Sequence, residues 1–289
     1  MLDSGLMYNL SVCKRKNPLR DSASVLDQEL GLLLFPEKDR VMLPTIADTQ
    51  VWEPEEIAFL KHFLRSGMNC INVGANIGYH SKHLSRIIGE TGRVYCYEPN
   101  PKVFKYLQFN LLQEELHNFE LYELAIGAHS GSAKLFLNDL NFGDSRLTDP
   151  RLIKEMVQNE NLGFYGKIRT TRVQIKSLDD IFLKKNLKID FILSDAQGWD
   201  CHVIRGGLGL IKRDYPTILF EYVPNWIKTI DPDPQDFFDA LRNLNYEFFT
   251  LGPSLLSALS PGLEVEELSR RESWYSNVIC ITRNLKHTI

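Results

Sequence analysis

The sequence has few cysteines and no excess of basic residues. Its five cysteines stand apart, without a CxxC pair, at Cys13, Cys70, Cys96, Cys201 and Cys280. This spacing excludes the usual zinc-knuckle and dithiol redox patterns and favours a reducing compartment. The formal net charge of −4 gives no general attraction to polyanions. We therefore expect no nucleic-acid partner.

Long apolar runs are also missing. No window approaches the roughly 20 apolar residues that a membrane-spanning helix needs. The amino terminus has no basic start followed by a long apolar stretch, so the sequence shows no secretory signal. We expect a cytoplasmic protein without membrane contact. Hydrophobic residues still make up 44% of the chain, which is enough for a full buried core.

The two common glycine-rich phosphate-binding motifs are absent as well. The candidate turn is INVGANIGYH, residues 71–80. A dinucleotide fingerprint needs G-x-G-x-x-G, but here Asn76 stands two positions after Gly74, and Tyr79 stands where the third glycine belongs. This argues against NAD, because the missing second glycine is the one that admits a pyrophosphate. No Gly-Lys-Ser/Thr follows, so a P-loop is excluded too.

Strand and helix patterns alternate over most of the chain. We interpret residues 1–50 as an irregular or cap segment and residues 51–289 as one α/β domain with an insert at about 128–178. A helix is expected at 53–67. A strand at 70–74 leads into a helix at 76–89, and a strand at 93–99 leads into a helix at 101–112. A further strand follows at 119–126. After the insert, which holds strands at 134–137 and 169–175, the same alternation returns at 189–195, 199–212, 217–223 and 234–245, and 247–251 and 277–282 form a closing hairpin. Such alternation predicts a mostly parallel sheet with helices on both faces.

The glycine turn and the next strand together indicate an adenosine site. Gly74 and Gly78 lack a Cβ, so backbone can approach a ligand closely there. Glu98 closes the following strand, where a carboxylate can accept hydrogen bonds from both hydroxyls of a ribose. Asp195 ends a later strand of the same expected sheet. A donor without phosphate, such as S-adenosylmethionine, fits this turn.

At this point the sequence resembles the FkbM-type methyltransferases. The matching segments are EPEE (53–56), INVGANIGYHS (71–81), GRVYCYEPNP (92–101), ELAIG (123–127), IKSLDDI (175–181), IDFILSDAQGWDCHVIRGG (189–207) and ILFEY (218–222). The resemblance implies a seven-stranded class I methyltransferase fold of the Rossmann-like type. It also implies methyl transfer from S-adenosylmethionine, usually to an oxygen of a sugar, polyketide or other natural product, with S-adenosylhomocysteine as the product.

Two positions depart from the family pattern. The family often has Lys and an apolar residue before Asp-x-Glu-Gly, where this chain has Leu193 and Ser194 before Asp195. Gln197 replaces the glutamate, a variant that recurs in this motif. The missing lysine removes any acceptor contact that it would make.

The candidate site residues follow from the turn, the strand ends and the resemblance. For the cofactor they are Asn72, Gly74, Ala75, Asn76, Gly78, Tyr79, Glu98, Pro99, Ala125, Asp195 and Gln197. For the acceptor they are Trp199, Asn141 and Arg146. For catalysis they are Asp195, with Glu221 and His80 behind it. Asp195 is either a general base or an anchor for the donor's amino group. Asp195 and Glu221 could also hold a divalent metal, but the sequence supplies no sure third ligand, so we assign no metal site.

The leading hypothesis is an O-methyltransferase acting on a hydroxyl-bearing small molecule; a homodimer is compatible with the sequence. A second hypothesis is a methyltransferase for RNA or protein. RNA would require a basic groove, and the amine-binding motif common in base-modifying enzymes is absent after IDFIL, residues 189–193. A third is a donor-binding protein without catalysis.

Overall fold

The central sheet has eight strands. The computed structural model describes residues 19, 21–115, 117–152, 169–231, 233–252, 256–270 and 275–283. In spatial order the strands are β12 (Leu256–Ala258), β11 (Tyr246–Leu251), β13 (Ser276–Thr282), β10 (Thr217–Tyr222), β9 (Phe191–Ser194), β3 (Asn69–Val73), β4 (Arg93–Tyr97) and β5 (Phe119–Tyr122). The five from β10 to β5 are parallel, and β13 is antiparallel to β10 and β11.

This order confirms the predicted class I methyltransferase-like α/β fold with a closing hairpin. The short β12 adds an eighth strand to the seven expected. Along the chain, β4 and β5 are added on one side of β3, whereas β9 and then β10 are added on its other side. β3 and β9 therefore flank the point where the strand order reverses. In open α/β sheets, ligands bind beyond the carboxyl ends of the strands at such a point.

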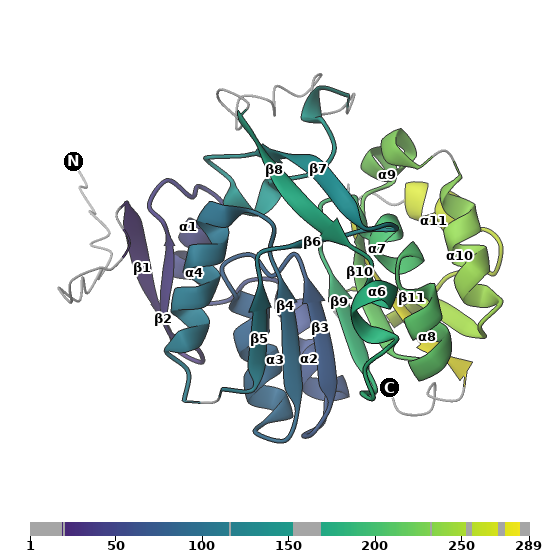
Figure 1. Ribbon diagram of the computed structural model, residues 1–289, viewed down its shortest axis with the longest axis horizontal. Helices are drawn as coiled ribbons and strands as arrows, with labels where there is room; N and C mark the ends of the chain where they lie inside the picture. Colours follow the sequence, from purple (N-terminus) through teal and green to yellow (C-terminus); the bar gives the residue numbers. More distant parts are fainter. Residues whose placement is uncertain are drawn as a thin grey trace, which may run out of the picture.

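Helices cover both faces of the sheet (Figure 1). One face packs on α2 (Pro54–Phe63), α3 (Tyr79–Ile88) and α4 (Pro101–Leu112), and the other on α6 (Leu178–Phe182), α7 (Asp200–Arg205), α8 (Leu208–Asp214) and α10 (Pro234–Arg242). Successive strand residues separate accordingly: Cys70 and Leu193 belong to the first core, Ile71 and Ile192 to the second. Two further helices, α9 (Pro224–Ile230) and α11 (Glu264–Ser269), lie near the carboxyl-terminal strands. Within the described ranges, no helix is both long and apolar enough to cross a membrane.

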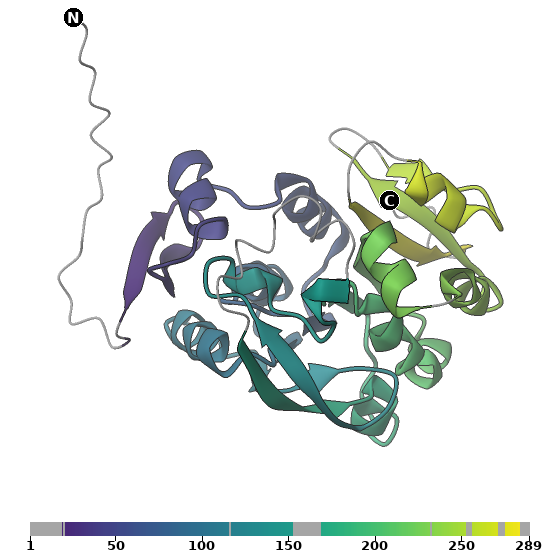
Figure 2. The ribbon, with the colours of Figure 1, turned by 90° about the horizontal axis from the view of Figure 1, so that it is seen from above.

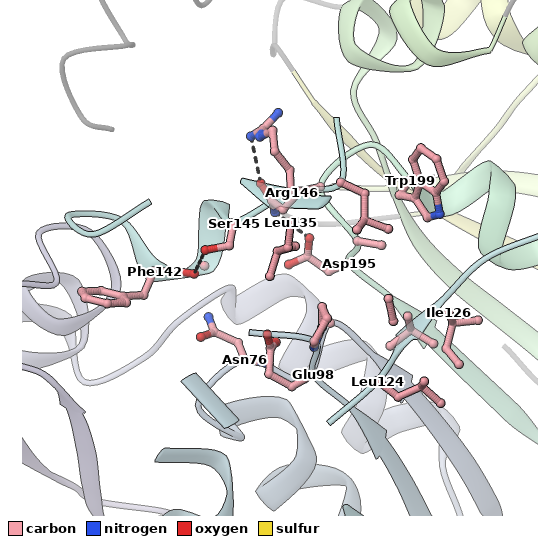
Figure 3. A pocket seen from close by; sticks show the side chains of 18 residues that line it. Asn76, Glu98, Leu124, Ile126, Leu135, Phe142, Ser145, Arg146, Asp195 and Trp199 are labelled. Atoms are coloured by element: carbon pink, nitrogen blue, oxygen red, sulfur yellow. Dashed lines mark hydrogen bonds between the residues drawn. The ribbon is translucent and has the colours of Figure 1, made fainter. Parts of the chain in front are cut away.

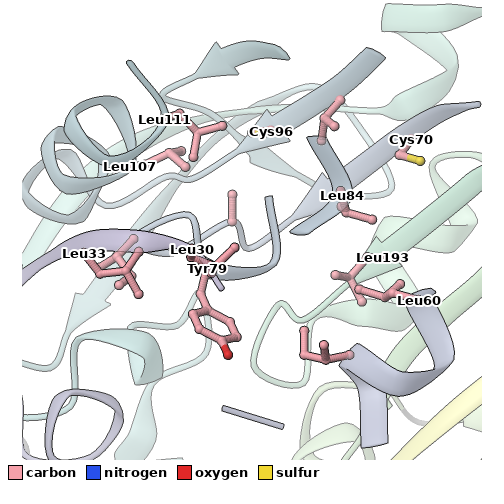
Figure 4. Packing of buried hydrophobic residues seen from close by; sticks show 14 of the residues in the cluster. Leu30, Leu33, Leu60, Cys70, Tyr79, Leu84, Cys96, Leu107, Leu111 and Leu193 are labelled. Atoms are coloured by element: carbon pink, nitrogen blue, oxygen red, sulfur yellow. The ribbon is translucent and has the colours of Figure 1, made fainter. Parts of the chain in front are cut away.

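The amino-terminal segment is more regular than predicted. It forms a hairpin of β1 (Ser22–Asp27) and β2 (Gly31–Pro36), followed by α1 (Met42–Thr49). The expectation of an irregular segment is therefore wrong for these residues, whereas residues 1–18 lie outside the described part. The hairpin belongs to the first core, because Leu33 and Phe35 are fully buried. Figure 4 shows Leu33 in this cluster. Buried Asn110 on α4 exchanges two hydrogen bonds with the backbone of Leu34, of 2.8 and 3.0 Å.

The expected strand at 119–126 is two strands in two sheets. β5 ends at Tyr122 in the main sheet, whereas β6 (Ala125–Ile126) pairs with β8 (Arg169–Lys176), which also pairs with β7 (Gly131–Leu137). The two strands expected in the insert thus pair with β6 in a three-stranded sheet. This sheet lies above one end of the strands of the main sheet (Figures 1 and 2). Two short 3-10 turns follow β7, η1 (Phe142–Asp144) and η2 (Pro150–Leu152). Residues 153–168 of the insert lie outside the described part.

The helix expected at 199–212 is also divided. α7 ends at Arg205 and α8 begins at Leu208, with Gly206 and Gly207 between them. A Cβ at Gly206 would lie 2.1 Å from the carbonyl oxygen of Gly127, which leaves no room for a side chain. The break therefore follows from close contact between this turn and the chain leaving β6.

Candidate functional site

A pocket opens at the carboxyl ends of β3, β4 and β9. It holds about 570 Å³ of empty space, part of which is open to solvent. The three-stranded sheet and η1 supply its other walls. The lining residues are Val73, Gly74, Asn76, Glu98, Pro99, Leu124, Ala125, Ile126, Leu135, Phe142, Gly143, Ser145, Arg146, Leu147, Asp195, Ala196, Gln197 and Trp199 (Figure 3).

Two backbone N–H groups hold the carboxylate of Glu98 in this pocket. Its Oε2 accepts the backbone N–H of Asn76 at 2.9 Å, and its Oε1 accepts the N–H of Asn100 at 2.7 Å. Each carboxylate oxygen has two lone-pair directions, so both oxygens can still accept from a ligand. Burial raises the pKa of Glu98 to about 7, against the opposing effect of the two backbone hydrogen bonds. The side chain is thus held in place by the chain itself before any ligand binds.

Asn76 brings a second polar group to the pocket. Its backbone is left-handed, with a φ of 50°, and this directs its N–H to Glu98. Its Oδ1 is buried and accepts no hydrogen bond from the described residues. A buried acceptor without a donor is costly, so a ligand donor at this place would be favourable. Figure 3 shows Asn76 beside Glu98.

The two glycines of the turn have packing roles. A Cβ on Gly74 would lie 1.8 Å from the carbonyl oxygen of Asp195, and the φ of Gly74 is 76°. Gly74 therefore permits the close contact between the ends of β3 and β9, and it also lines the pocket. A Cβ on Gly78 would lie 2.7 Å from the side chain of Leu111 on α4, so Gly78 serves helix packing and does not line the pocket.

Asp195 and Arg146 occupy the wall across from Glu98 (Figure 3). Gln197 donates from Nε2 to Asp195 Oδ1 at 2.7 Å, and Arg146 Nη2 donates to Gln197 Oε1 at 3.4 Å. The fully buried guanidinium of Arg146 stacks 3.8 Å from the Trp226 ring centroid and pairs with Asp144. Burial raises the pKa of Asp195, while the hydrogen bond from Gln197 and the charge of Arg146 oppose the shift.

The comparisons with known proteins agree with this geometry. The sequence matches the family model of the methyltransferase FkbM domain over residues 72–248, which is more than half of the chain. The chain belongs to the FkbM methyltransferase family. The family match starts at Asn72, inside β3, and ends inside β11, so it spans the donor-side turn, Glu98, the insert and Asp195.

Several solved structures match the chain at low identity. They include methyltransferase FkbM from Methylobacillus flagellatus (12% identity, 75% of this chain and 44% of that chain, TM-score 0.46), fibrillarin from Aeropyrum pernix with natively bound S-adenosyl-L-methionine (16%, 78% and 72%, 0.38) and a SAM-dependent methyltransferase from Aquifex aeolicus (13%, 80% and 98%, 0.35). The chain thus spans less than half of the Methylobacillus protein. A comparison with curated proteins found no match.

Most of the cofactor, acceptor and catalytic residues expected from the sequence line this pocket together. These are Gly74, Asn76, Glu98, Pro99, Ala125, Arg146, Asp195, Gln197 and Trp199. Asn72 instead donates to Ser81 Oγ, and Ala75 is buried in the core. Tyr79 packs in the same core and its hydroxyl accepts the N–H of Trp52 at 3.2 Å (Figure 4). Asn141 does not line the pocket, although its neighbours Phe142 and Gly143 do.

Glu221 lines a second, smaller space that Asp195 also borders, whereas His80 does not line it. About 210 Å³ of empty space lies among Glu53, Glu56, Asp195, Glu221 and Asn277, together with apolar strand residues. His80 contacts Glu53 and Glu56, each at 3.3 Å. We call this space the acidic cavity. From the sequence, Glu53 and Glu56 are interpreted as the start of a helix and as part of the EPEE segment of the family resemblance, not as site residues. The missed signal is the pair of acids spaced three apart at the start of that helix.

Proposed function

We propose that the chain is an S-adenosylmethionine-dependent methyltransferase that acts on a hydroxyl group of a small molecule. The observation that carries the proposal is the preorganised Glu98 carboxylate in a pocket at the reversal point of the sheet. S-adenosylmethionine, when bound, supplies an electrophilic methyl group on a sulfonium centre. The buried free cysteines also support our proposal of a reducing, cytoplasmic compartment.

The pocket residues fit the adenosine part of such a donor. Glu98 would accept hydrogen bonds from the two ribose hydroxyls, because both of its oxygens retain acceptor capacity. Asn76 Oδ1 lacks a donor among the described residues and would accept one from the ligand. Apolar side chains would pack on the flat adenine ring; they are those of Leu124, Ala125, Ile126, Leu135 and Phe142.

Asp195 is the group best placed to move the acceptor's proton. It borders both the pocket and the acidic cavity, so it can face a donor on one side and an acceptor on the other. A raised pKa suits a general base, since proton transfer is most efficient when the pKa lies nearer to the working pH. The acceptor oxygen would bond to the methyl carbon, the C–S electron pair would stay on sulfur, and the hydroxyl proton would pass to Asp195.

The deciding experiment is a screen with methyl-labelled donor against hydroxyl-bearing small molecules, run beside calorimetry of donor binding. Labelled product from a hydroxyl acceptor, together with donor binding, is the expected result. Transfer to RNA or protein alone would contradict the small-molecule acceptor. Donor binding without transfer to any acceptor would favour a donor-binding protein without catalysis. Mass spectrometry of a co-purified metabolite would identify the acceptor.

A further inference from the structure

The acidic cavity gathers four carboxyl groups, and one imidazole contacts two of them. Glu53 and Glu56 come from the start of α2, and Asp195 and Glu221 lie at the ends of neighbouring strands. His80 lies in the first turn of α3 and contacts Glu53 and Glu56. Glu56 is only 6% exposed. Buried carboxylates are usually paired with a cation or bound to a metal ion.

His80 faces this group of acids with one ring nitrogen. Its Nε2 atom is fully buried and forms no hydrogen bond with the described residues, although one oxygen each of Glu53 and Glu56 lies 3.3 Å away. Glu221 Oε2 is likewise buried without a hydrogen-bond partner among these residues. Arg146 acts on Asp195 and Glu221 from the donor-pocket side.

The distances match those between ligands that share one metal ion. Two atoms that each lie about 2.0–2.2 Å from an ion, at a tetrahedral or octahedral angle, are about 2.8–3.6 Å apart. The two 3.3 Å distances from His80 Nε2 fall in this range, and the ligand atoms of Glu53, Glu56 and His80 all lie within 4.8 Å of one another. An imidazole nitrogen facing two carboxylates is also the usual donor chemistry of a transition-metal site.

We propose that Glu53, Glu56 and His80 bind one divalent transition-metal cation between them, at the side of the acidic cavity that Glu53 and Glu56 line. Carboxylate ligands with a single imidazole suit a cation such as Mn²⁺. The ion would neutralise the buried acids and would hold the acceptor's oxygen beside Asp195, where a bound cation also makes a hydroxyl more acidic. This role for the ion rests on the methyl transfer proposed above, whereas the site itself does not.

The test is titration of the chelator-treated full chain with Mn²⁺, followed by calorimetry and by the electron paramagnetic resonance signal of free Mn²⁺. We expect one ion per chain. Glu56→Gln and His80→Gln should each weaken binding at least about tenfold, since loss of even an indirect partner of a metal ligand has that effect. Glu55→Gln is the matched control, because it removes the same charge from the same turn of α2 but does not line the cavity. It should bind like the natural chain.

Thermal unfolding separates a metal site from a purely structural cluster. Without metal, Glu56→Gln should unfold at about the same temperature as the natural chain, because the substitution keeps the shape of the side chain. With Mn²⁺, it should gain less than the natural chain. Absence of Mn²⁺ binding, or equal affinity in all four proteins, would overturn the site. S-adenosylhomocysteine binding, measured on the same samples, tests the donor pocket independently, so either proposal can fail without the other.

Discussion

At the scale of single residues, Glu98 is the group on which donor binding should depend most. Glu98→Gln keeps the shape but removes the charge that strengthens hydrogen bonds from the ribose hydroxyls, each worth about 1.5–3 kcal/mol. We expect calorimetry to show S-adenosylmethionine affinity about 10- to 100-fold lower. Glu90→Gln, at an exposed site, is the control and should bind normally. Unchanged affinity in Glu98→Gln would place the ribose contact elsewhere.

The raised pKa of Glu98 makes donor binding depend on pH. The group changes charge near pH 7 in the folded free protein instead of at its ordinary value of 4.5. Only the ionised carboxylate accepts from both hydroxyls, so donor affinity should rise with pH and be about tenfold lower at pH 6 than at pH 8. Calorimetry across this range measures the effect, and Glu98→Gln should remove it. A flat profile in the natural chain would contradict the assignment.

The raised pKa of Glu98 has the opposite effect on the stability of the ligand-free protein, because its contribution to that stability falls as the pH rises. Between pH 4.5 and about 7 the folded state keeps a proton on Glu98 that the unfolded state has lost. Stability falls with rising pH wherever the folded state binds more protons. The contribution of Glu98 to the free energy of unfolding therefore decreases across this window, and ligand binding at higher pH offsets it.

Asp195 has two candidate roles that kinetics can separate. Loss of a general base lowers kcat by about 10²–10⁴-fold and leaves donor affinity intact. Loss of an anchor for the donor's amino group weakens donor binding instead. Because Asp195 borders both cavities, we expect Asp195→Asn to show the first pattern once an acceptor is known. Full turnover with normal donor binding would remove Asp195 from the mechanism and favour Glu221.

Gly74 is less useful as a test of the site than its position suggests. Any side chain there meets the backbone of Asp195, so a valine would disturb the junction of β3 and β9 whether or not a ligand binds. Loss of donor binding in Gly74→Val would therefore not identify the cofactor loop. Glu98 and Asn76, which act through polar atoms facing the pocket, give clearer variants.

At the scale of elements, the amino-terminal hairpin should behave as part of the core. Phe35 on β2 is fully buried in the same cluster as α3 and α4, so Phe35→Ala should lower the free energy of unfolding by about 3–5 kcal/mol. Leu26→Ala on the paired strand β1 is the control, because Leu26 is 65% exposed. Urea unfolding measures both. A loss below about 1 kcal/mol for Phe35→Ala would mean that the hairpin is only loosely attached.

The charges on α11 do not all face solvent. Glu264 is completely buried, although Glu266 and Arg270 are exposed. The carboxylate of Glu264 pairs with Arg242 of α10 and accepts a hydrogen bond from Gln235 at 2.9 Å. An acid can be buried in this way when a partner helix supplies both a charge and an amide, and neither partner is visible from the sequence of α11 alone.

At the scale of the whole molecule, the preference for S-adenosylhomocysteine over NAD should be measurable as a difference in thermal stability. A ligand present at 100 times its Kd stabilises the folded state by about 2.7 kcal/mol. We expect S-adenosylhomocysteine to raise the Tm by several degrees and NAD to leave it unchanged. NAD requires a glycine-lined approach for its pyrophosphate, and here Asn76 occupies that position. Differential scanning calorimetry tests this, and stabilisation by NAD would contradict the donor assignment.

The sequence by itself determined the order of strands and helices around the turn after β3 and the acid after β4. These features are local: side-chain periodicity reports burial along one element, and a turn depends on a few neighbouring residues. The ends of two expected strands then placed Glu98 and Asp195 at the same end of the sheet, and the resemblance to FkbM enzymes agreed with this placement. The pocket contains both.

Only the tertiary structure decided how distant elements meet. The chain at 119–126 enters two sheets because β8 pairs with β6 after β5 has ended. Glu53 and Glu56 meet His80 because α2 packs against α3, and the same packing brings them to the cavity beside Glu221. Contacts between residues far apart in the chain depend on which elements pair and how closely they approach, and the pattern within one element does not contain that information.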